Sequence, residues 1–208
     1  IKSENTREGS PLNGKVDINS FAVSGWSMGG GGAQLAASID PSLKAVVGLC
    51  PWLDLNGFQD SDLFHNVPVL IFTGQNDDIA SSSEYGYMHY ANTPSNTDKL
   101  YFEIENGGHG AANAPDMAGG EIGVYALSWL KTFLLEDPCY CDFLLENPSN
   151  SSAYETNIDC ESLELRSPYV EEMILLHPNP ASGSIFLNLS EIGALKYEVY
   201  DAMGNCVK

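Results

Sequence analysis

The sequence predicts an α/β protein with a mostly parallel sheet flanked by helices, followed by the start of a small β-sandwich. Strand-length apolar segments alternate with segments of helical periodicity as far as Glu136. A glycine-rich turn separates the first strand from the first helix. After Pro138 the sequence becomes polar, and from Met173 short alternating segments follow one another with turn residues between them.

Each element of the first part rests on its own local pattern. Buried parallel strands are typically short, nearly continuous apolar runs, and such runs are expected at residues 21–23, 44–50, 67–73 and 99–105. Helices are expected at residues 34–38, 81–91 and 120–136, the last because its apolar positions recur at helical spacing. This alternation of strand and helix favours parallel strands with helices on both faces.

The second part has a different pattern. Residues 142–167 are polar and are expected to form loops. Strands are expected within residues 174–180, 184–189 and 195–201, where turn residues separate short alternating segments. We therefore predict two domains, residues 1–165 and residues 166–208.

The glycine-rich turn contains the pattern Gly25-x-Ser27-x-Gly29. Between a strand and a helix, this pattern is typical of the nucleophile elbow of α/β-hydrolases, which holds a serine hydroxyl out of the sheet. The crowded backbone is expected to require glycine two residues to either side of the serine. A turn that only joins strand to helix is the competing interpretation. We predict that Ser27 is a nucleophile and that residues 1–165 are the C-terminal portion of an α/β-hydrolase domain.

A serine nucleophile needs a histidine base, which in this fold follows a strand late in the chain. His109 follows the strand expected at 99–105 and lies in a glycine-flanked loop. The other three histidines precede a strand, lie in an expected helix or belong to the second domain: His65, His89 and His177. We therefore predict His109 as the base, against the alternative of an ordinary surface histidine.

The base needs a carboxylate to orient it, which is expected after an earlier strand end. Asp77 and Asp78 both follow the strand expected at 67–73, and Asp54 follows the strand expected at 44–50. Asp77 is the preferred acid, while Asp78 is expected to cap a helix or to face water.

An oxyanion needs two backbone N–H donors. Met28, the residue after the nucleophile, is expected to supply one of them. The chain begins about two dozen residues before its elbow, so we expect the second donor and several strands to lie upstream of residue 1. Trp26 and Trp52 follow strand ends and are expected either to line the substrate cleft or to pack in the core.

Composition excludes several classes of partner. With 28 acidic and 9 basic residues the formal net charge is −19, which disfavours nucleic acids and anionic lipids. No apolar run reaches the length of a membrane span. Three of the five cysteines lie in the loop-rich stretch just after the last helix of the first part, which is typical of a bridge in an exported protein. Either Cys139 or Cys141 is expected to pair with Cys160. A zinc site is disfavoured because Cys139-x-Cys141 has the wrong spacing.

These motifs together resemble the bacterial cutinases and poly(ethylene terephthalate) hydrolases. The resemblance is carried by Gly25–Gly32, Pro51-Trp52, Asn76-Asp77 and Asn106–His109. It implies a polyester or ester substrate and no cofactor or metal. It also implies Ser27 as nucleophile, Asp77 as acid, His109 as base, Met28 as oxyanion donor and Trp52 as an aromatic wall. A disulfide near the end of the hydrolase domain is implied as well.

The sequence departs from the best-known plastic hydrolase at one structural feature. That enzyme has a second disulfide beside its acid and base, and Gly74 and Ala111 stand at the matching positions here. We therefore expect the loop that contains His109 to be more mobile than in that enzyme. The acidic surface is expected to weaken adsorption to a polymer.

The tail carries a separate resemblance. The segments His177–Gly183 and Tyr197–Gly204 resemble the C-terminal sorting domain of the Bacteroidota type IX secretion system. An ordinary β-sandwich accessory domain is the alternative. The resemblance implies export through that machinery, followed by release or attachment at the cell surface.

The sequence thus predicts a secreted, monomeric serine ester hydrolase with an acyl-enzyme intermediate. Two other classes of function fit the same scaffold. One is a different hydrolase, related to dienelactone hydrolases or to peptidases. The other is a secreted binding protein without catalytic activity.

Overall fold

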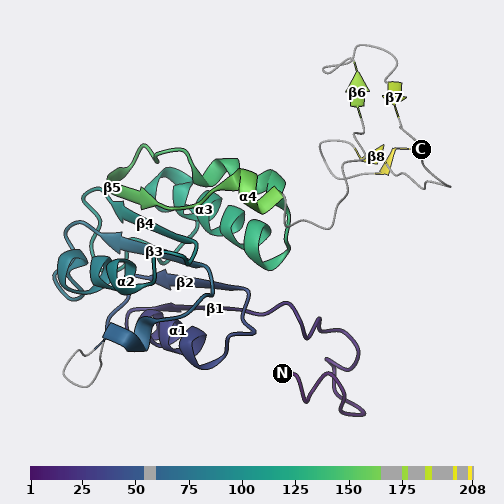
Figure 1. Ribbon diagram of the computed structural model, residues 1–208, viewed down its shortest axis with the longest axis horizontal. Helices are drawn as coiled ribbons and strands as arrows, with labels where there is room; N and C mark the ends of the chain where they lie inside the picture. Colours follow the sequence, from purple (N-terminus) through teal and green to yellow (C-terminus); the bar gives the residue numbers. More distant parts are fainter. Residues whose placement is uncertain (54–59, 165–174, 178–185, 189–198, 201–205, 208) are drawn as a thin grey trace. The chain divides into compact units, whose positions relative to one another are not determined.

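The computed structural model describes residues 1–53, 60–164, 175–177, 186–188, 199–200 and 206–207 (Figure 1). Contacts between Cα atoms divide the chain into two units, Ile1–Ser167 and Pro168–Lys208. The first unit contains a five-stranded sheet with helices on both faces, preceded by turns over residues 1–20. In the described part of the chain no helix combines the length and the apolar character needed to cross a membrane.

The sheet has the strand order β1-β2-β3-β4-β5. Its strands are β1 (Ala22–Trp26), β2 (Ala45–Leu49), β3 (Val69–Gly74), β4 (Lys99–Ile104) and β5 (Ser151–Thr156). The first four strands pair in parallel in their sequence order, and β5 pairs antiparallel with β4. Because the parallel strands point the same way, the segments that follow β1, β2, β3 and β4 all leave from one edge of the sheet.

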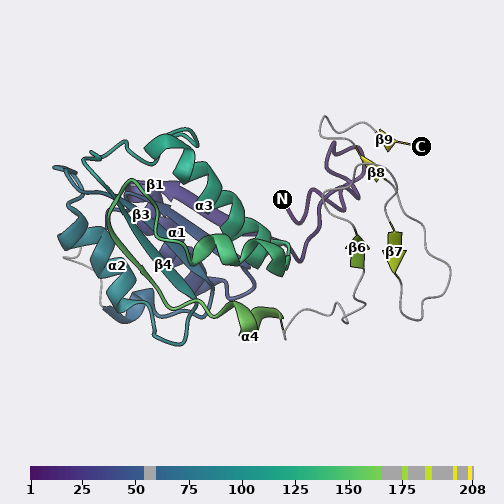
Figure 2. The same cartoon turned by 90° about the horizontal axis from the view of Figure 1, so that it is seen from above.

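The helices lie on both sides of this sheet (Figures 1 and 2). The α-helices of the first unit are α1 (Met28–Ile39), α2 (Tyr87–Asn92), α3 (Glu121–Trp129) and α4 (Cys160–Glu164). Short 3₁₀ turns are η1 (Asp60–Leu63), η3 (Ala118–Gly120), η5 (Pro138–Tyr140) and η6 (Asp142–Leu144). The π-helical turns η2 (Ser82–Gly86) and η4 (Leu130–Leu134) adjoin α2 and α3.

Alternate residues of each strand supply the two layers of the core. In β3, Val69 and Ile71 pack with residues of α1 and α2, whereas Leu70 and Phe72 pack with residues of α3. All six residues of β3 are buried, because both of its faces are covered. The continuous apolar runs that predicted parallel strands therefore have this physical origin.

The predicted strands and helices of the first part are confirmed, with shifted ends. The first helix begins earlier than expected, at Met28, so that the glycine-rich run after the serine is helical. The helix expected at 120–136 is divided into α3 and the π turn η4.

The expectation that residues 142–167 form only loops is wrong. Ser151–Thr156 form the antiparallel edge strand β5, and Cys160–Glu164 form α4. The strand carries little apolar sequence because only one of its neighbours is a strand. Tyr154 anchors it: its ring contacts those of Phe102 and Tyr125, and its hydroxyl donates to the carbonyl of Leu144.

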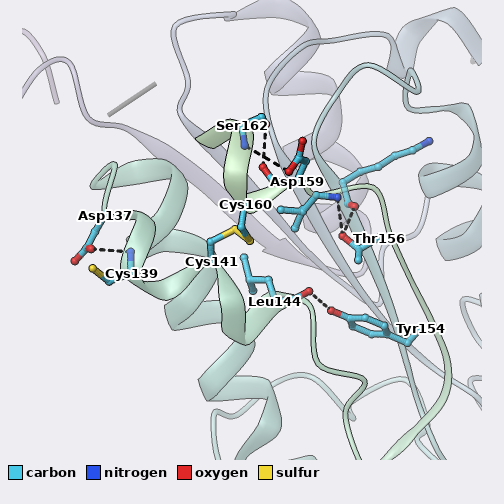
Figure 3. Close-up of a disulfide and its surroundings, with 11 residues drawn as sticks. Asp137, Cys139, Cys141, Leu144, Tyr154, Thr156, Asp159, Cys160 and Ser162 are labelled. Carbon is cyan, nitrogen blue, oxygen red and sulfur yellow. Dashed lines mark hydrogen bonds between the residues drawn. A yellow bond between two sulfur atoms is a disulfide. The ribbon is translucent and has the colours of Figure 1, made fainter. Parts of the chain in front are cut away.

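A disulfide joins Cys141 to Cys160, which decides between the two predicted pairings (Figure 3). Both of its cysteines are buried in the core layer beneath α3. Cys139 is exposed, and its backbone N–H donates to the carboxylate of Asp137.

The second unit is described only as two pairs of short strands. Strands β6 (Leu175–His177) and β7 (Phe186–Asn188) are antiparallel, as are β8 (Val199–Tyr200) and β9 (Cys206–Val207). The first three lie within the segments expected to be strands. Most residues of the two sorting-domain motifs lie outside the described part of the chain, and the predicted domain identities stay predictions.

Candidate active site

Ser27 stands between the last residue of β1 and the first residue of α1 in a strained backbone conformation. Its φ of 55° and ψ of −122° lie outside the regions that residues with a Cβ ordinarily occupy. Its N–H donates to Leu49 O at 2.9 Å, and its carbonyl accepts from the N–H of Trp52 at 2.9 Å. The end of β2 therefore holds the turn in place from both sides.

The predicted need for glycine on both sides of Ser27 holds on one side only. A Cβ on Gly25 would lie 2.1 Å from the carbonyl oxygen of Gly29, so no other residue fits there. A Cβ on Gly29 would meet nothing within 4 Å, and that half of the expectation is wrong. The crowding falls instead at Gly31, where a Cβ would lie 2.3 Å from the carbonyl oxygen of Trp52.

The structure brings the predicted serine, histidine and aspartate together at one edge of the sheet. The Oγ of Ser27 lies 2.9 Å from Nε2 of His109, and Nδ1 of His109 lies 2.8 Å from Oδ2 of Asp77. Asp77 belongs to the acid loop (residues 75–80) after β3, and His109 to the base loop (residues 105–112) after β4. Three separate strand ends thus supply one continuous chain of hydrogen bonds.

The carboxylate of Asp77 is held by its own loop. Its side chain is fully buried, and Oδ1 accepts from the backbone N–H groups of Ile79 at 2.9 Å and Ala80 at 2.7 Å. Oδ2 is left for the imidazole. The neighbouring Asp78 is exposed, which fits the expectation that it faces water.

The two other histidines whose side chains the structure describes are buried away from this cluster. His65 is buried, with Nε2 2.6 Å from Oε1 of Gln34. His89 is buried in α2, and burial lowers its pKa to about 4. Asp54 and the side chain of His177 lie outside the described residues.

Met28 places its backbone N–H beside the serine. It is the first residue of α1, and the first N–H groups of a helix have no acceptor within the helix. The helix N-terminus also carries partial positive charge. The side chain of Met28 is exposed.

The two tryptophans stand at the end of β1 and just after the end of β2. Trp26 is 47% exposed, and its indole Nε1–H donates to the carbonyl oxygen of His109 at 2.8 Å. Its ring lies 5.0 Å from the imidazole ring, centroid to centroid. Trp52 is half-buried, and its ring lies 6.1 Å from that of Tyr85 in η2. Neither tryptophan belongs to either core layer.

Sequence reasoning missed Tyr85 and Cys50. Tyr85 lies in a tyrosine-rich helical segment, and nothing local shows that it meets Trp52. Cys50 follows β2 with a φ of 42° and is 1% exposed. Burial, together with the charge of Asp77, raises the pKa of its thiol to about 12. It packs against the base loop at Ala112. Its place directly after a strand end was the available signal.

Within the described residues, no group of three or more histidine, cysteine, aspartate or glutamate side chains could hold a metal ion. The hydrogen bonds among Ser27, His109 and Asp77 have the geometry that a serine nucleophile, its base and an orienting carboxylate require.

Comparison with known proteins shows the family of the chain. A family model described as PET hydrolase-like matches residues 1–161. The chain belongs to the PET hydrolase-like family. Among curated proteins, Cutinase est1 of Thermobifida alba is 38% identical over 143 residues, which are 69% of this chain and 46% of that protein. A bis(hydroxyethyl) terephthalate hydrolase of Streptomyces coelicolor is 35% identical over 147 residues, which are 70% of this chain and 45% of that protein. A cutinase of Thermobifida fusca is 37% identical over 142 residues, 68% of this chain and 45% of that protein.

This PET hydrolase-like chain spans about half the length of the curated relatives it matches. The family match covers the five-stranded sheet and the disulfide, and it ends before the second unit.

Proposed function

We propose that the protein is a serine hydrolase of carboxylic esters, with Ser27 as nucleophile, His109 as base and Asp77 as the orienting acid. The observation that carries the proposal is the unbroken chain of hydrogen bonds from Oγ of Ser27 through both imidazole nitrogens to Oδ2 of Asp77. The family description and the curated relatives support the same class of reaction, since the relatives are named as cutinases and as a bis(hydroxyethyl) terephthalate hydrolase.

The first half of the reaction follows from this geometry. Nε2 of His109 takes the proton of Ser27 as Oγ attacks the ester carbonyl, and the imidazolium is stabilised by the carboxylate of Asp77. The carbonyl oxygen becomes negative and is stabilised by the N–H of Met28 at the helix N-terminus. His109 then gives its proton to the leaving alkoxide, which departs as the alcohol and leaves an acyl-enzyme on Ser27.

The second half repeats the same proton transfers with water. His109 takes a proton from a water molecule, the hydroxide attacks the acyl carbon, and the proton returns to Oγ of Ser27 as the acid leaves. One histidine serves both halves because Nε2 faces the serine while Nδ1 is fixed by Asp77.

The proposed substrates are aliphatic or aromatic esters, including the ester units of polyesters. The exposed ring of Trp26 and the half-buried ring of Trp52, at the ends of β1 and β2, offer flat apolar surfaces for such substrates. Tyr85 extends the Trp52 surface.

The test is hydrolysis of a p-nitrophenyl ester and of bis(hydroxyethyl) terephthalate by the natural protein. Ser27→Ala is expected to reduce kcat/KM by at least about 10⁴-fold, because the nucleophile is lost. Ser24→Ala is the matched control, since Ser24 is an exposed serine of the same strand, and it is expected to retain activity. No hydrolysis by the folded natural protein would favour a binding protein instead. Cleavage of peptides but not of esters would favour a peptidase.

We also propose that the protein is exported as a monomer by type IX secretion machinery. The motifs in residues 177–183 and 197–204 support this, and the Cys141–Cys160 disulfide fits an oxidising compartment. In a host with that machinery, deletion of residues 166–208 is expected to keep the enzyme inside the cell envelope. Unchanged appearance in the medium would contradict the proposal. Light scattering of the purified protein tests the monomer.

A further inference from the structure

His109 takes part in three hydrogen bonds with residues of other segments. Its two ring nitrogens contact Ser27 and Asp77, and its backbone carbonyl accepts from the indole N–H of Trp26 at 2.8 Å. Ser27 and Trp26 are consecutive residues, 82 and 83 positions away from His109. Ser27, the proposed nucleophile, is therefore the chain neighbour of Trp26, which binds the backbone of His109.

The base loop has a composition that makes such a contact useful. His109 stands between Gly108 and Gly110, and glycine allows a backbone more conformations than any other residue. The structure contains no disulfide at the base loop. The hydrogen bond from Trp26, the last residue of β1, restricts the position of the His109 carbonyl relative to Ser27.

We infer that Trp26 is a positioning residue for the base, through its indole N–H and the carbonyl of His109. This inference rests on the proposed function. It differs from a role as an aromatic wall, because a wall needs only a flat ring, whereas positioning needs the N–H donor. The ring of Trp26 lies tilted at 44° to the imidazole and does not stack flat on it, which fits a contact made chiefly through the N–H.

The expected magnitude follows from the exposure of the contact. Trp26 is 47% exposed, so water competes for both partners of the bond. Loss of the bond is expected to slow proton transfer by about 3- to 10-fold, because small displacements of a catalytic group reduce the rate.

The test compares Trp26→Phe, which keeps an aromatic ring and removes the donor, with Ser24→Ala on the same strand. For the natural protein acting on a p-nitrophenyl ester, Trp26→Phe is expected to lower kcat about 3- to 10-fold and to leave KM within about twofold. A loss of kcat smaller than twofold overturns the inference, whatever happens to KM. A raised KM with an unchanged kcat would show that Trp26 is only an aromatic wall.

A readout that does not depend on turnover separates this inference from the proposed function. The Nδ1 proton of His109, bonded to Asp77, is observed by NMR. Trp26→Phe is expected to speed its exchange with water at least about threefold, because the imidazole is less firmly held. Unchanged exchange overturns the inference even if kcat falls. If Trp26→Phe fails to fold by circular dichroism, Trp26→Leu also removes the donor and is read by the same proton exchange.

Discussion

Two regions of the first unit hold distant segments of the chain together, one by a covalent bond and the other by non-covalent contacts. Near its C-terminal end, Cys141 and Cys160 are joined covalently, and both are buried. At the strand ends, the acid loop and the base loop are joined without a covalent bond, by hydrogen bonds and by close contact of their backbones. The N–H of Asn76 donates to Gly107 O at 2.7 Å, and the N–H of Asn106 donates to Oε1 of Gln75 at 2.9 Å.

The difference teaches what each kind of bond is suited to. A disulfide stabilises chiefly by restricting the unfolded chain, and it does little to align neighbouring groups. The loop pair aligns Asp77 and His109, and it does so by close approach of two backbones. A Cβ on Gly74 would lie 2.5 Å from the carbonyl oxygen of Gly108. The position that carries a cysteine in the best-known plastic hydrolase is thus too crowded here for any side chain.

The largest expected effect comes from the acid. In Asp77→Asn the amide oxygen must face the N–H groups of Ile79 and Ala80, so the NH₂ group faces Nδ1 of His109. This arrangement leaves the single proton of the neutral imidazole on Nε2. That nitrogen then cannot accept the proton of the Ser27 hydroxyl. We expect kcat/KM for a soluble ester to fall by about 10³- to 10⁴-fold. Asp78→Asn, a change of the exposed neighbour, is expected to stay within about twofold, and an equal loss there would contradict this account.

The next effect is expected on the covalent side. Replacing Cys141 and Cys160 together by serine is expected to lower the free energy of unfolding by about 2–4 kcal/mol, measured by urea denaturation. The value of kcat below the unfolding transition is expected to remain unchanged. Cys139→Ser should leave the bridge intact, as counted by mass spectrometry. A catalytic defect in the double variant would show that the disulfide also aligns the loops.

The contact between the acid loop and the base loop is expected to be disrupted by a single added methyl group. Gly74→Ala must separate the acid loop from the base loop, which we expect to cost about 1–3 kcal/mol of stability and to lower kcat about tenfold. Gly32→Ala is the matched control, because a Cβ there meets nothing within 4 Å on an exposed face of α1. That change should stabilise the protein by about 0.5–1 kcal/mol. Equal behaviour of the two variants would remove the argument from close approach.

The smallest effect concerns the buried thiol of Cys50, which tests whether the acid loop and the base loop stay together. Burial, together with the charge of Asp77, raises the pKa of the Cys50 thiol to about 12, so the reactive thiolate is scarce at pH 8. Iodoacetamide is therefore expected to leave Cys50 unmodified in the native protein and to alkylate it in urea, as read by peptide mass spectrometry. Faster alkylation in Gly74→Ala would report separation of the loops. Rapid alkylation of the native protein would show that the loop pair opens without substitution.

The sequence predicted the parallel part of the sheet because buried strands must be apolar on both faces, as β3 is. The same reasoning missed β5, whose sequence Ser-Ser-Ala-Tyr-Glu-Thr is mostly polar. An edge strand is fixed by its pairing with β4 and by the packing of Tyr154, and neither is visible in local sequence.

The three predicted side chains of the site meet because strand order and parallel direction bring strand ends to one edge. That rule depends only on the order of motifs, so it could be applied to the sequence. The contacts of Trp26 with His109 and of Trp52 with Tyr85 depend on side-chain directions across loops, and no spacing rule supplies them. The crowding at Gly31, where Gly29 was expected, likewise depends on how the helix leaves the turn.

The most direct test of the account is where a fluorophosphonate reacts with the natural protein. If Ser27, His109 and Asp77 act together, the probe adds once per chain, and peptide mapping finds it on Ser27. His109→Ala should slow that reaction at least about 10³-fold. Ester hydrolysis by a protein whose probe adduct maps to another residue, or to none, would contradict the account.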